Sequence, residues 1–224
     1  DGSITSTVSA NTTAGISIVS YTGNGSSGAT VGHGLGAIPK MIITKSRDNT
    51  TNWTSYHASL GNTGRIRLNL QDAAQTGQTN WNSQTPTASL FYLGTNSDTN
   101  GNGNNIIAYC FAEKPGFSKF GTYKGNGYAD GTYVNVGFKP ALVILKRTDA
   151  GSSNWQLNDT ARDNVNIAKK RLSPSTSDPE YTNLDMGDIL SNGFKIKQTD
   201  QTWNNSSGTY LFFAMFTLSL AVSF

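Results

Sequence analysis

Two histidines are the side chains best suited to acid–base chemistry in this chain of 224 residues. His33 lies between Gly32 and Gly34, and His57 follows Tyr56. General acid–base catalysis needs an imidazole within hydrogen-bond reach of the groups that exchange its proton. The sequence places neither a carboxylate nor the single cysteine next to either histidine. We therefore interpret both histidines as structural.

The carboxylates are no better placed for catalysis. Asp159 and Asp163 lie on either side of Arg162, a spacing typical of a local ion-pair cluster. A glycosidase needs two carboxylates that flank the bond to be broken, on elements that hold them in place. The sequence also lacks the Gly-x-Ser-x-Gly motif of a nucleophilic serine. We therefore expect no catalytic residues and a protein that is not an enzyme.

Two kinds of glycine-rich pattern invite a comparison with ligand-binding loops. Residues 98–103 (DTNGNG) match the first half of an EF-hand calcium loop, but Tyr109 occupies the place of its bidentate glutamate. Residues 23–25 and 32–36 carry glycines at alternate positions, yet neither stretch opens a helix or precedes the lysine of a phosphate-binding loop. We interpret all three as tight turns and expect no metal site and no cofactor.

Tryptophans in polar loops are the best candidates for a binding site. Trp81 and Trp203 stand in the stretches TNWNS and QTWNN. An exposed indole beside amide groups suits stacking on a sugar ring, so the candidate ligand-binding residues are Trp81, Asn82, Trp203 and Asn204. Two alternatives stay open: a contact with another protein, or an indole that folds onto the core beneath its own loop.

Composition favours an all-β protein. Only 14% of the residues are charged, and Gly, Asn and Ser separate short stretches of Val, Ile, Tyr, Phe and Thr. The net charge is +3 and the longest basic run is residues 169–171, so we expect no nucleic-acid partner. The apolar run 210–224 is interrupted by Ser and Thr and is shorter than the roughly 20 apolar residues of a membrane helix, so we expect no membrane insertion. We interpret the single Cys110 as a small buried side chain.

The sequence repeats itself at offsets of 101 to 104 residues. An ordered series of landmarks at nearly one spacing predicts two copies of one unit, each the size of a small domain. Because Trp53 and Trp155 occupy equivalent places, we expect both in the cores. The repeated landmarks are 21–25 (YTGNG) with 123–127 (YKGNG), 39–48 with 140–149, 52–53 with 154–155, and 106–107 with 210–211.

Short strands separated by turn residues predict a β-sandwich for each copy. We expect two tandem, internally duplicated, jelly-roll-like units packed together: residues 15–115, and residues 116–224 with a divergent apolar C-terminal tail. Residues 1–14 are interpreted as an extended arm or linker, and residues 168–172 as a short helix. Strands are predicted at 16–21, 40–45, 53–60, 65–70, 88–94, 106–112, 117–123, 133–138, 141–146, 154–158, 193–198 and 209–216, with 41–44 and 142–145 central and buried.

Several stretches resemble a domain of structural proteins in tailed bacteriophages, especially marine and cyanobacterial phages. The resemblance covers nearly the whole chain after residue 14, and its motifs are specific as a set. One departure is that similar proteins end the second copy with Phe-Ala-Glu-Asn-Pro, where residues 215–219 read MFTLS. The stretches that carry the resemblance are 19–25, 31–36, 39–43, 53 with 56–60, 107–113, 146–149, 159–163 and 190–194.

The resemblance implies a virion component with no catalytic residues to carry over. We therefore expect a non-enzymatic bacteriophage structural protein, in a tail fibre, a spike or a capsid decoration, exposed on the particle and in contact with the host surface. The alternative is a carbohydrate-binding receptor-recognition module. The expected partners are further copies of the chain in a homotrimer, other virion proteins and a host surface glycan.

Overall fold

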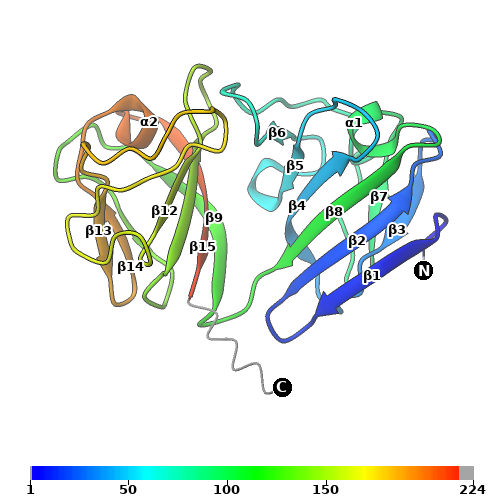
Figure 1. Cartoon of the computed structure of the whole chain (residues 1–224), viewed down its shortest axis with the longest axis horizontal. Coiled ribbons are helices and arrows are strands. Elements are labelled where there is room, and N and C mark those ends of the chain that lie inside the picture. The colour runs from blue at the N-terminus through cyan, green and yellow to red at the C-terminus, as the bar shows by residue number, and fades with distance from the viewer. Residues whose placement is uncertain (1, 217–224) are drawn as a thin grey trace. The chain divides into compact units, whose positions relative to one another are not determined.

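The computed structural model describes residues 2–216, and Figure 1 shows its elements. Strands pair in antiparallel sheets, and the helical segments among these residues have four residues or fewer, so the all-β prediction is confirmed. The chain divides into two compact units. Unit 1 contains Asp1–Lys114 and Thr148–Ser153, and unit 2 contains Pro115–Arg147 and Asn154–Phe224.

Unit 1 is organised around a six-stranded sheet in the order β1-β2-β8-β4-β5-β6, and β3 and β7 form a second sheet. The predicted central strand lies in β4, between β8 and β5, where Met41, Ile42 and Thr44 are buried. The elements are β1 (Ser6–Asn11), β2 (Ile16–Thr22), β3 (Ala29–Gly32), β4 (Pro39–Ser46), β5 (Thr54–His57), η1 (Ala58–Leu60), β6 (Ile66–Arg67), β7 (Leu90–Leu93), α1 (Ser97–Asn100) and β8 (Asn105–Ala112).

Unit 2 contains a four-stranded sheet in the order β12-β11-β15-β9 and a three-stranded sheet in the order β10-β14-β13. The second predicted central strand lies in β11, between β12 and β15, with Val143 and Leu145 fully buried. The elements are β9 (Ser118–Lys124), β10 (Tyr133–Asn135), β11 (Leu142–Arg147), β12 (Gln156–Asp159), β13 (Gly187–Leu190), β14 (Gly193–Ile196), α2 (Gln201–Asn204) and β15 (Thr209–Met215).

Each unit has its own hydrophobic core. In unit 1, Val19 of β2 and Phe91 of β7 belong to one cluster, so the two sheets share that core. In unit 2, Val143 of β11 and Phe194 of β14 likewise belong to one cluster, which joins the two sheets of that unit. Full burial of such a side chain contributes about 1.5–3 kcal/mol, which makes these apolar positions the main source of stability in a chain without disulfides.

The same hydrogen bonds recur in the two units at the predicted offsets. Tyr21 Oη donates to the carbonyl of Thr99 at 2.6 Å, and Tyr123 Oη donates to the carbonyl of Trp203 at 2.8 Å. Gly23 and Gly125 each lie so close to a backbone oxygen that a Cβ would stand 2.4 or 2.2 Å from it. Only glycine fits there, which explains the repeated Gly-Asn-Gly pattern.

Two asparagines hold these glycine-rich turns in place. Asn100 ends α1 and Asn204 ends α2, and both are fully buried. Their side-chain oxygens accept from the backbone N–H of Asn24 and Asn126, both at 2.9 Å. The side-chain N–H groups of the two asparagines donate to backbone carbonyls: Asn100 to Ser26 (3.0 Å) and Gly94 (2.8 Å), and Asn204 to Tyr128 (2.8 Å) and Gln198 (2.9 Å).

That the two units are copies of one duplicated β-sandwich stays a prediction.

Residues 1–14 were expected to form an arm or linker, but they contain a sheet strand. β1 pairs with β2 without a break, from Ser6 opposite Tyr21 to Asn11 opposite Ile16. Most of β1 is exposed, so its sequence lacks the apolar alternation that marks a half-buried strand. Backbone hydrogen bonds hold this edge strand in the sheet, and they require no particular pattern of side chains that the sequence could reveal.

Two other local predictions are wrong. Residues 168–172 are not helical, because Ala168 and Arg171 form isolated bridges with Gly187 and Tyr181. A helix of this length is unstable alone, and pairing across the unit satisfies the backbone instead. The strand predicted at residues 65–70 is reduced to Ile66–Arg67, because the chain turns away after two residues.

Candidate functional site

The tryptophans predicted to bind a ligand are buried. Trp81 and Trp203 are each 1% exposed, and both belong to the hydrophobic cores. Trp81 packs edge-on against Tyr56, with ring centroids 5.8 Å apart. Neither indole has an open face for stacking on a sugar. The alternative that each indole folds onto the core beneath its own loop is therefore correct.

The two asparagines predicted beside these tryptophans also have structural roles. Asn204 is the fully buried residue that holds the turn of unit 2. Asn82 is only half-buried, and its side-chain oxygen accepts a hydrogen bond from Ser27 Oγ at 2.7 Å. Asn82 lies in a turn, as the sequence predicted, whereas Asn204 lies in the short helix α2. The sequence did not reveal that both segments fold inward.

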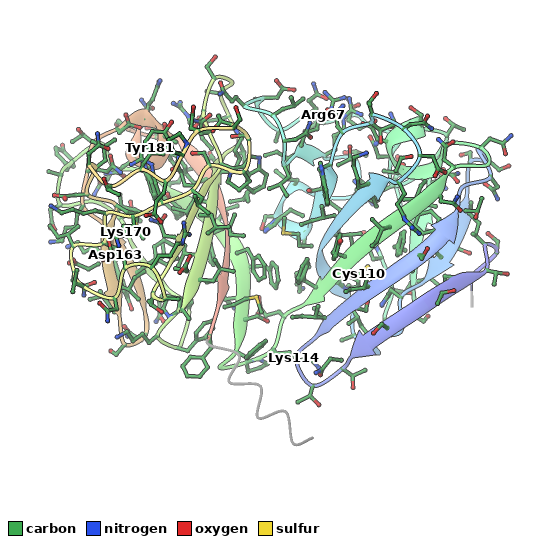
Figure 2. The ribbon with its side chains drawn as sticks, in the orientation of Figure 1. Arg67, Cys110, Lys114, Asp163, Lys170 and Tyr181 are labelled. Atoms are coloured by element: carbon green, nitrogen blue, oxygen red, sulfur yellow. The ribbon has the colours of Figure 1, made fainter. Side chains whose placement is uncertain are left out.

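The histidines and the cysteine are engaged in the fold. Leu35 N–H donates to His33 Nδ1 at 3.3 Å, and His33 Nε2 lies 3.2 Å from the carbonyl of Thr87, which together fit a neutral ring. His57 Nδ1 accepts from Ser59 N–H at 3.2 Å and caps η1. Cys110 is fully buried, and burial raises the pKa of its thiol to about 12, so it stays protonated. Figure 2 labels Cys110 within unit 1.

The acidic residues singled out by the sequence are also engaged. Asp159 forms an ion pair with Arg162. Burial raises the pKa of Asp159, but its hydrogen bonds from Arg162 outweigh burial and hold the pKa below its ordinary value. Asp163 accepts from the backbone N–H groups of Lys169 and Lys170 at 2.6 and 3.0 Å; Asp163 and Lys170 are labelled in Figure 2.

The residues of the calcium-like loop serve the fold as well. Asp98 lies in α1 and accepts from Thr54 Oγ1 at 3.0 Å. Within residues 2–216, His, Cys, Asp and Glu side chains form no group of three that could hold a metal ion. In the same range, no helix has the length and apolar character needed to cross a bilayer.

A pocket in unit 2 forms where three neighbouring strands end. The order β12-β11-β15 and its antiparallel register place the start of β11 beside the ends of β12 and β15. Lys139 and Pro140 precede β11, Thr160 follows β12, and Phe216 follows β15. The sheet therefore brings together side chains that are far apart in the sequence. We call this site the Lys139 pocket; Lys139, Pro140, Ala141, Thr160, Asn164 and Phe216 line it.

Backbone hydrogen bonds fix the frame of the Lys139 pocket. Ala141 N–H donates to the carbonyl of Met215 at 2.7 Å, and Thr160 N–H donates to the carbonyl of Ala141 at 2.9 Å. Phe216 N–H donates to the carbonyl of Phe117 at 2.7 Å. Three of the lining segments are thus tied to the sheet, which is a rigid support for a binding site.

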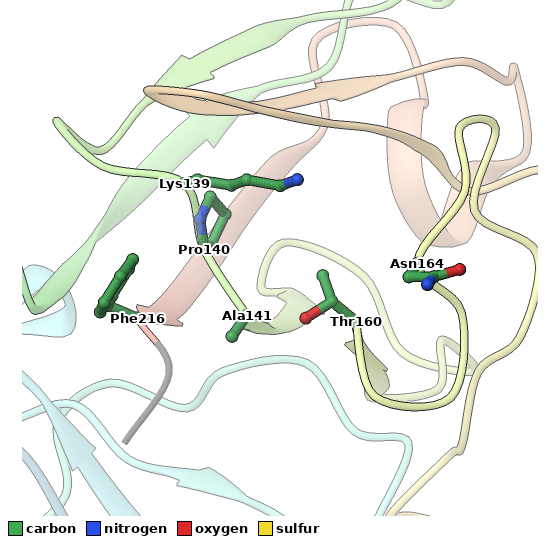
Figure 3. Close-up of a pocket in the computed structure, with 6 residues that line it drawn as sticks. All are labelled: Lys139, Pro140, Ala141, Thr160, Asn164 and Phe216. Atoms are coloured by element: carbon green, nitrogen blue, oxygen red, sulfur yellow. The ribbon is translucent and has the colours of Figure 1, made fainter. Parts of the chain in front are cut away.

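The side chains of the Lys139 pocket are available to a ligand. Among the described residues, none provides a hydrogen bond or ion pair to the Lys139 ammonium, the Thr160 hydroxyl or the Asn164 amide. Phe216 is 46% exposed and packs edge-on against Phe138. Figure 3 shows Phe216 at one end of the row and Asn164 at the other. The pocket has a volume of about 260 Å³, and its lining includes no carboxylate.

Unit 1 has a second hollow of a different character. It has a volume of about 380 Å³ and contains no charged side chain in its lining, so it offers few groups that could orient a ligand. The residues that line it are Val8, Gly32, Gly34, Gly36, Ala88 and Ser89. The Lys139 pocket is therefore the stronger candidate.

Sequence reasoning did not identify the Lys139 pocket. Lys139, Thr160 and Phe216 lie in three separate stretches, and no motif links them. One usable signal was present. The stretch that begins at Pro140 repeats the stretch that begins at Pro39, but Lys139 stands where the first copy has Ile38.

Comparison with known proteins places the chain in a family. A family model described as a domain of unknown function (DUF7483) matches residues 1–217. No curated protein and no solved structure matches the chain. Because the family model covers nearly the whole length, the chain belongs to the DUF7483 family.

Proposed function

We propose that this member of the DUF7483 family is a non-enzymatic structural protein of a bacteriophage particle, exposed in a tail fibre, a spike or a capsid decoration. The observation that carries the proposal is the turn network that recurs in both units, built on Tyr21 with Asn100 and on Tyr123 with Asn204. Repeated modules present the same surface more than once, which suits multivalent contacts within a particle.

The sequence resemblance to virion proteins supports the same function. It extends over nearly the whole chain after residue 14. The groups that could have suggested catalysis, His33, His57 and the Asp159–Arg162 pair, are all engaged in structural contacts. In this proposal the chain forms a homotrimer that binds other virion proteins.

The experiment is to locate the chain in purified particles of a phage that encodes it. Mass spectrometry of density-banded virions should detect it at a copy number comparable to known tail or capsid proteins. Gold-labelled antibodies against the chain should then decorate one structure on intact particles. A chain that stays in the lysate and is depleted from the banded virions would contradict the proposal; a non-structural phage protein serves as the control for carry-over.

A second candidate function is a carbohydrate-recognition module. The observation that favours it is the Lys139 pocket, where an exposed aromatic ring, an amide, a hydroxyl and an ammonium line one small cavity. This is the mixture of apolar and polar groups by which proteins orient small ligands. The two functions are compatible, because a virion protein that is exposed on the particle can also bind a host glycan.

A further inference from the structure

We propose that the Lys139 pocket binds a single sugar ring that carries a carboxylate, such as a uronic acid residue of a surface polysaccharide. The inference rests on the second candidate function and deepens it, because it names the ligand class and the residues that recognise it. It does not depend on where the protein is located.

The size and lining of the pocket favour one sugar ring. Its volume of about 260 Å³ lies below the roughly 300–1,000 Å³ of pockets for drug-sized ligands. Phe216 offers a partly exposed ring that can cover the apolar face of a pyranose. The Thr160 hydroxyl can donate and accept hydrogen bonds, and the Asn164 amide can do both as well, which matches the hydroxyl groups of a sugar.

The charge of the pocket favours a carboxylate on that ring. Lys139 is the one charged residue in the lining, and among the described residues no acidic side chain pairs with it. The two acids next to the pocket in sequence do not compensate its charge, since Asp159 is paired with Arg162 and Asp163 accepts two backbone N–H groups. A charge-assisted hydrogen bond from an ammonium to a carboxylate is stronger than a neutral one.

Unit 1 provides an internal comparison for this site. In unit 1, Met41 pairs with His57 on one side and with Phe111 on the other. In unit 2, Leu142 pairs with Asp159 and with Met215 in the same way. Met41 therefore corresponds to Leu142, His57 to Asp159 and Phe111 to Met215. The positions that match the Lys139 pocket are thereby fixed without any sequence alignment: Ile38 corresponds to Lys139, Ala58 to Thr160 and Ala112 to Phe216.

This comparison shows that the ring, the hydroxyl and the ammonium belong to unit 2 alone. The frame is common to both units, since Ala112 N–H donates to the carbonyl of Gly15 just as Phe216 N–H donates to that of Phe117. Unit 1 keeps the frame but has two alanines and an isoleucine in place of the ring, the hydroxyl and the ammonium. If Lys139, Thr160 and Phe216 served only to hold the ends of the strands together, the side chains found in unit 1 would suffice at these positions.

The test is an NMR titration of the full chain, labelled with ¹⁵N, using glucuronate, glucose and inorganic phosphate as probes. Glucuronate should shift the amide signals of Ala141, Thr160 and Asn164 in a saturable way, with a dissociation constant of about 1 mM. Glucose should shift the same signals with roughly tenfold weaker affinity, because it lacks the carboxylate. Phosphate should cause smaller shifts than glucuronate, because it cannot use the ring of Phe216.

Three variants separate the roles of the side chains. Lys139→Ala should weaken glucuronate binding roughly tenfold and leave glucose binding unchanged. Phe216→Ala should weaken the binding of both sugars. Lys170→Ala removes the same charge from an exposed residue of unit 2 outside the pocket, and it should change the binding of neither glucuronate nor glucose. Unchanged signals from the rest of unit 2 show that each variant is folded.

Several outcomes would overturn the inference. They are no saturable shift with glucuronate, equal affinity for glucuronate and glucose, an equal response to phosphate, or glucuronate binding that Lys139→Ala leaves intact. If Phe216→Ala does not fold, the loss or retention of glucuronate binding in Lys139→Ala still tests the inference. Because the titration uses the isolated chain, its failure is distinct from failure to find the chain in virions.

Discussion

Arg65 and Arg171 show how one residue type at matching places can have different surroundings. Arg65 pairs with Gln75 in an isolated bridge, and Arg171 pairs with Tyr181 in the same way. The Arg65 guanidinium donates to Gln75 Oε1 at 2.9 Å and to Asn80 Oδ1 at 3.3 Å. Arg171 instead lies over the Tyr181 ring, 4.5 Å from its centroid, and no described residue accepts from its buried Nε and Nη1. In unit 2 a ring replaces the hydrogen-bond acceptors.

We expect Arg65→Met to destabilise the protein more than Arg171→Met. The first change leaves the half-buried side-chain oxygen of Gln75 and the buried one of Asn80 without this donor, at a cost of about 1–3 kcal/mol. The second removes a cation–π contact worth about 0.5–2 kcal/mol, but it also relieves a buried charge that lacks acceptors, so the net change should be below about 1 kcal/mol. Urea unfolding of both variants measures the difference, and a larger loss for Arg171→Met would contradict this account.

His33 should make the stability of unit 1 depend on pH. The ring is fully buried, and burial lowers its pKa from the ordinary 6.5, although its hydrogen bond with Thr87 opposes part of this shift. Between the lowered pKa and 6.5, the unfolded state binds more protons than the folded state, so stability that is present above pH 6.5 is lost as the pH falls.

The measurement compares wild type with His33→Gln in urea unfolding at about pH 7.5 and pH 5. The wild type should lose more unfolding free energy over this interval than the variant does, because the glutamine side chain does not titrate. Equal losses in the two proteins would show that other groups, and not His33, cause the pH dependence.

At the scale of the elements, β4 is an inner strand of the six-stranded sheet of unit 1, and β11 is an inner strand of the four-stranded sheet of unit 2. The sequence identified both as central, but it did not identify which faces are most buried. Ile43 and Ile144 are half-buried, whereas Ile42 and Val143 are fully buried. The difference follows from the alternation of side chains along a strand, which an unbroken apolar run conceals.

We expect Ile42→Asp and Val143→Asp to prevent soluble folding. A buried carboxylate without a partner costs several kcal/mol, which is a large part of the 5–15 kcal/mol that stabilises a typical domain. Ile18→Asp, at a position of β2 that is 44% exposed, is the matched control and should change the free energy of unfolding by less than about 1 kcal/mol. Soluble yield and thermal melting test the set; wild-type melting of either core variant would contradict the assigned burial.

Three of the elements that the sequence missed share one physical cause. β1 is mostly exposed, and α1 and α2 are only four residues long. None of them has enough apolar residues to produce a period. They are held by backbone pairing with β2 or by buried Asn100 and Asn204, which are interactions with distant parts of the chain.

At the scale of the whole molecule, the expected homotrimer stays a prediction. The apolar stretch 211–224 motivated this expectation. Its residues 211–215 are buried, as Leu211 and Phe212 show, and residues 217–224 lie outside the described range. A different feature now supports association. β1 forms one edge of the six-stranded sheet and carries no charged residue or proline, the usual protection of an exposed edge.

We expect light scattering after gel filtration to give three times the chain mass of 23.9 kDa at micromolar concentration. Thr7→Lys and Ser9→Lys place charges on the exposed edge strand β1, so they should shift the equilibrium toward monomer if that edge takes part. A monomer at all concentrations, with no virion protein bound, would contradict the prediction.

The sequence by itself determined the all-β class and the positions of the central strands. Turn residues and β-branched runs act locally, so they can be recognised without knowing what lies opposite them. The 101–104 offset between landmarks also predicted which residues occupy equivalent places, including Tyr21 with Tyr123.

Only the tertiary structure decided which polar-loop residues are accessible. Trp81 and Trp203 have a local sequence typical of an exposed binding loop, but the loops fold inward and the indoles complete the cores. Conversely, Lys139, Thr160 and Phe216 meet because β12, β11 and β15 are neighbours in a sheet. Exposure and proximity depend on long-range strand pairing, and no local pattern of residues encodes that pairing.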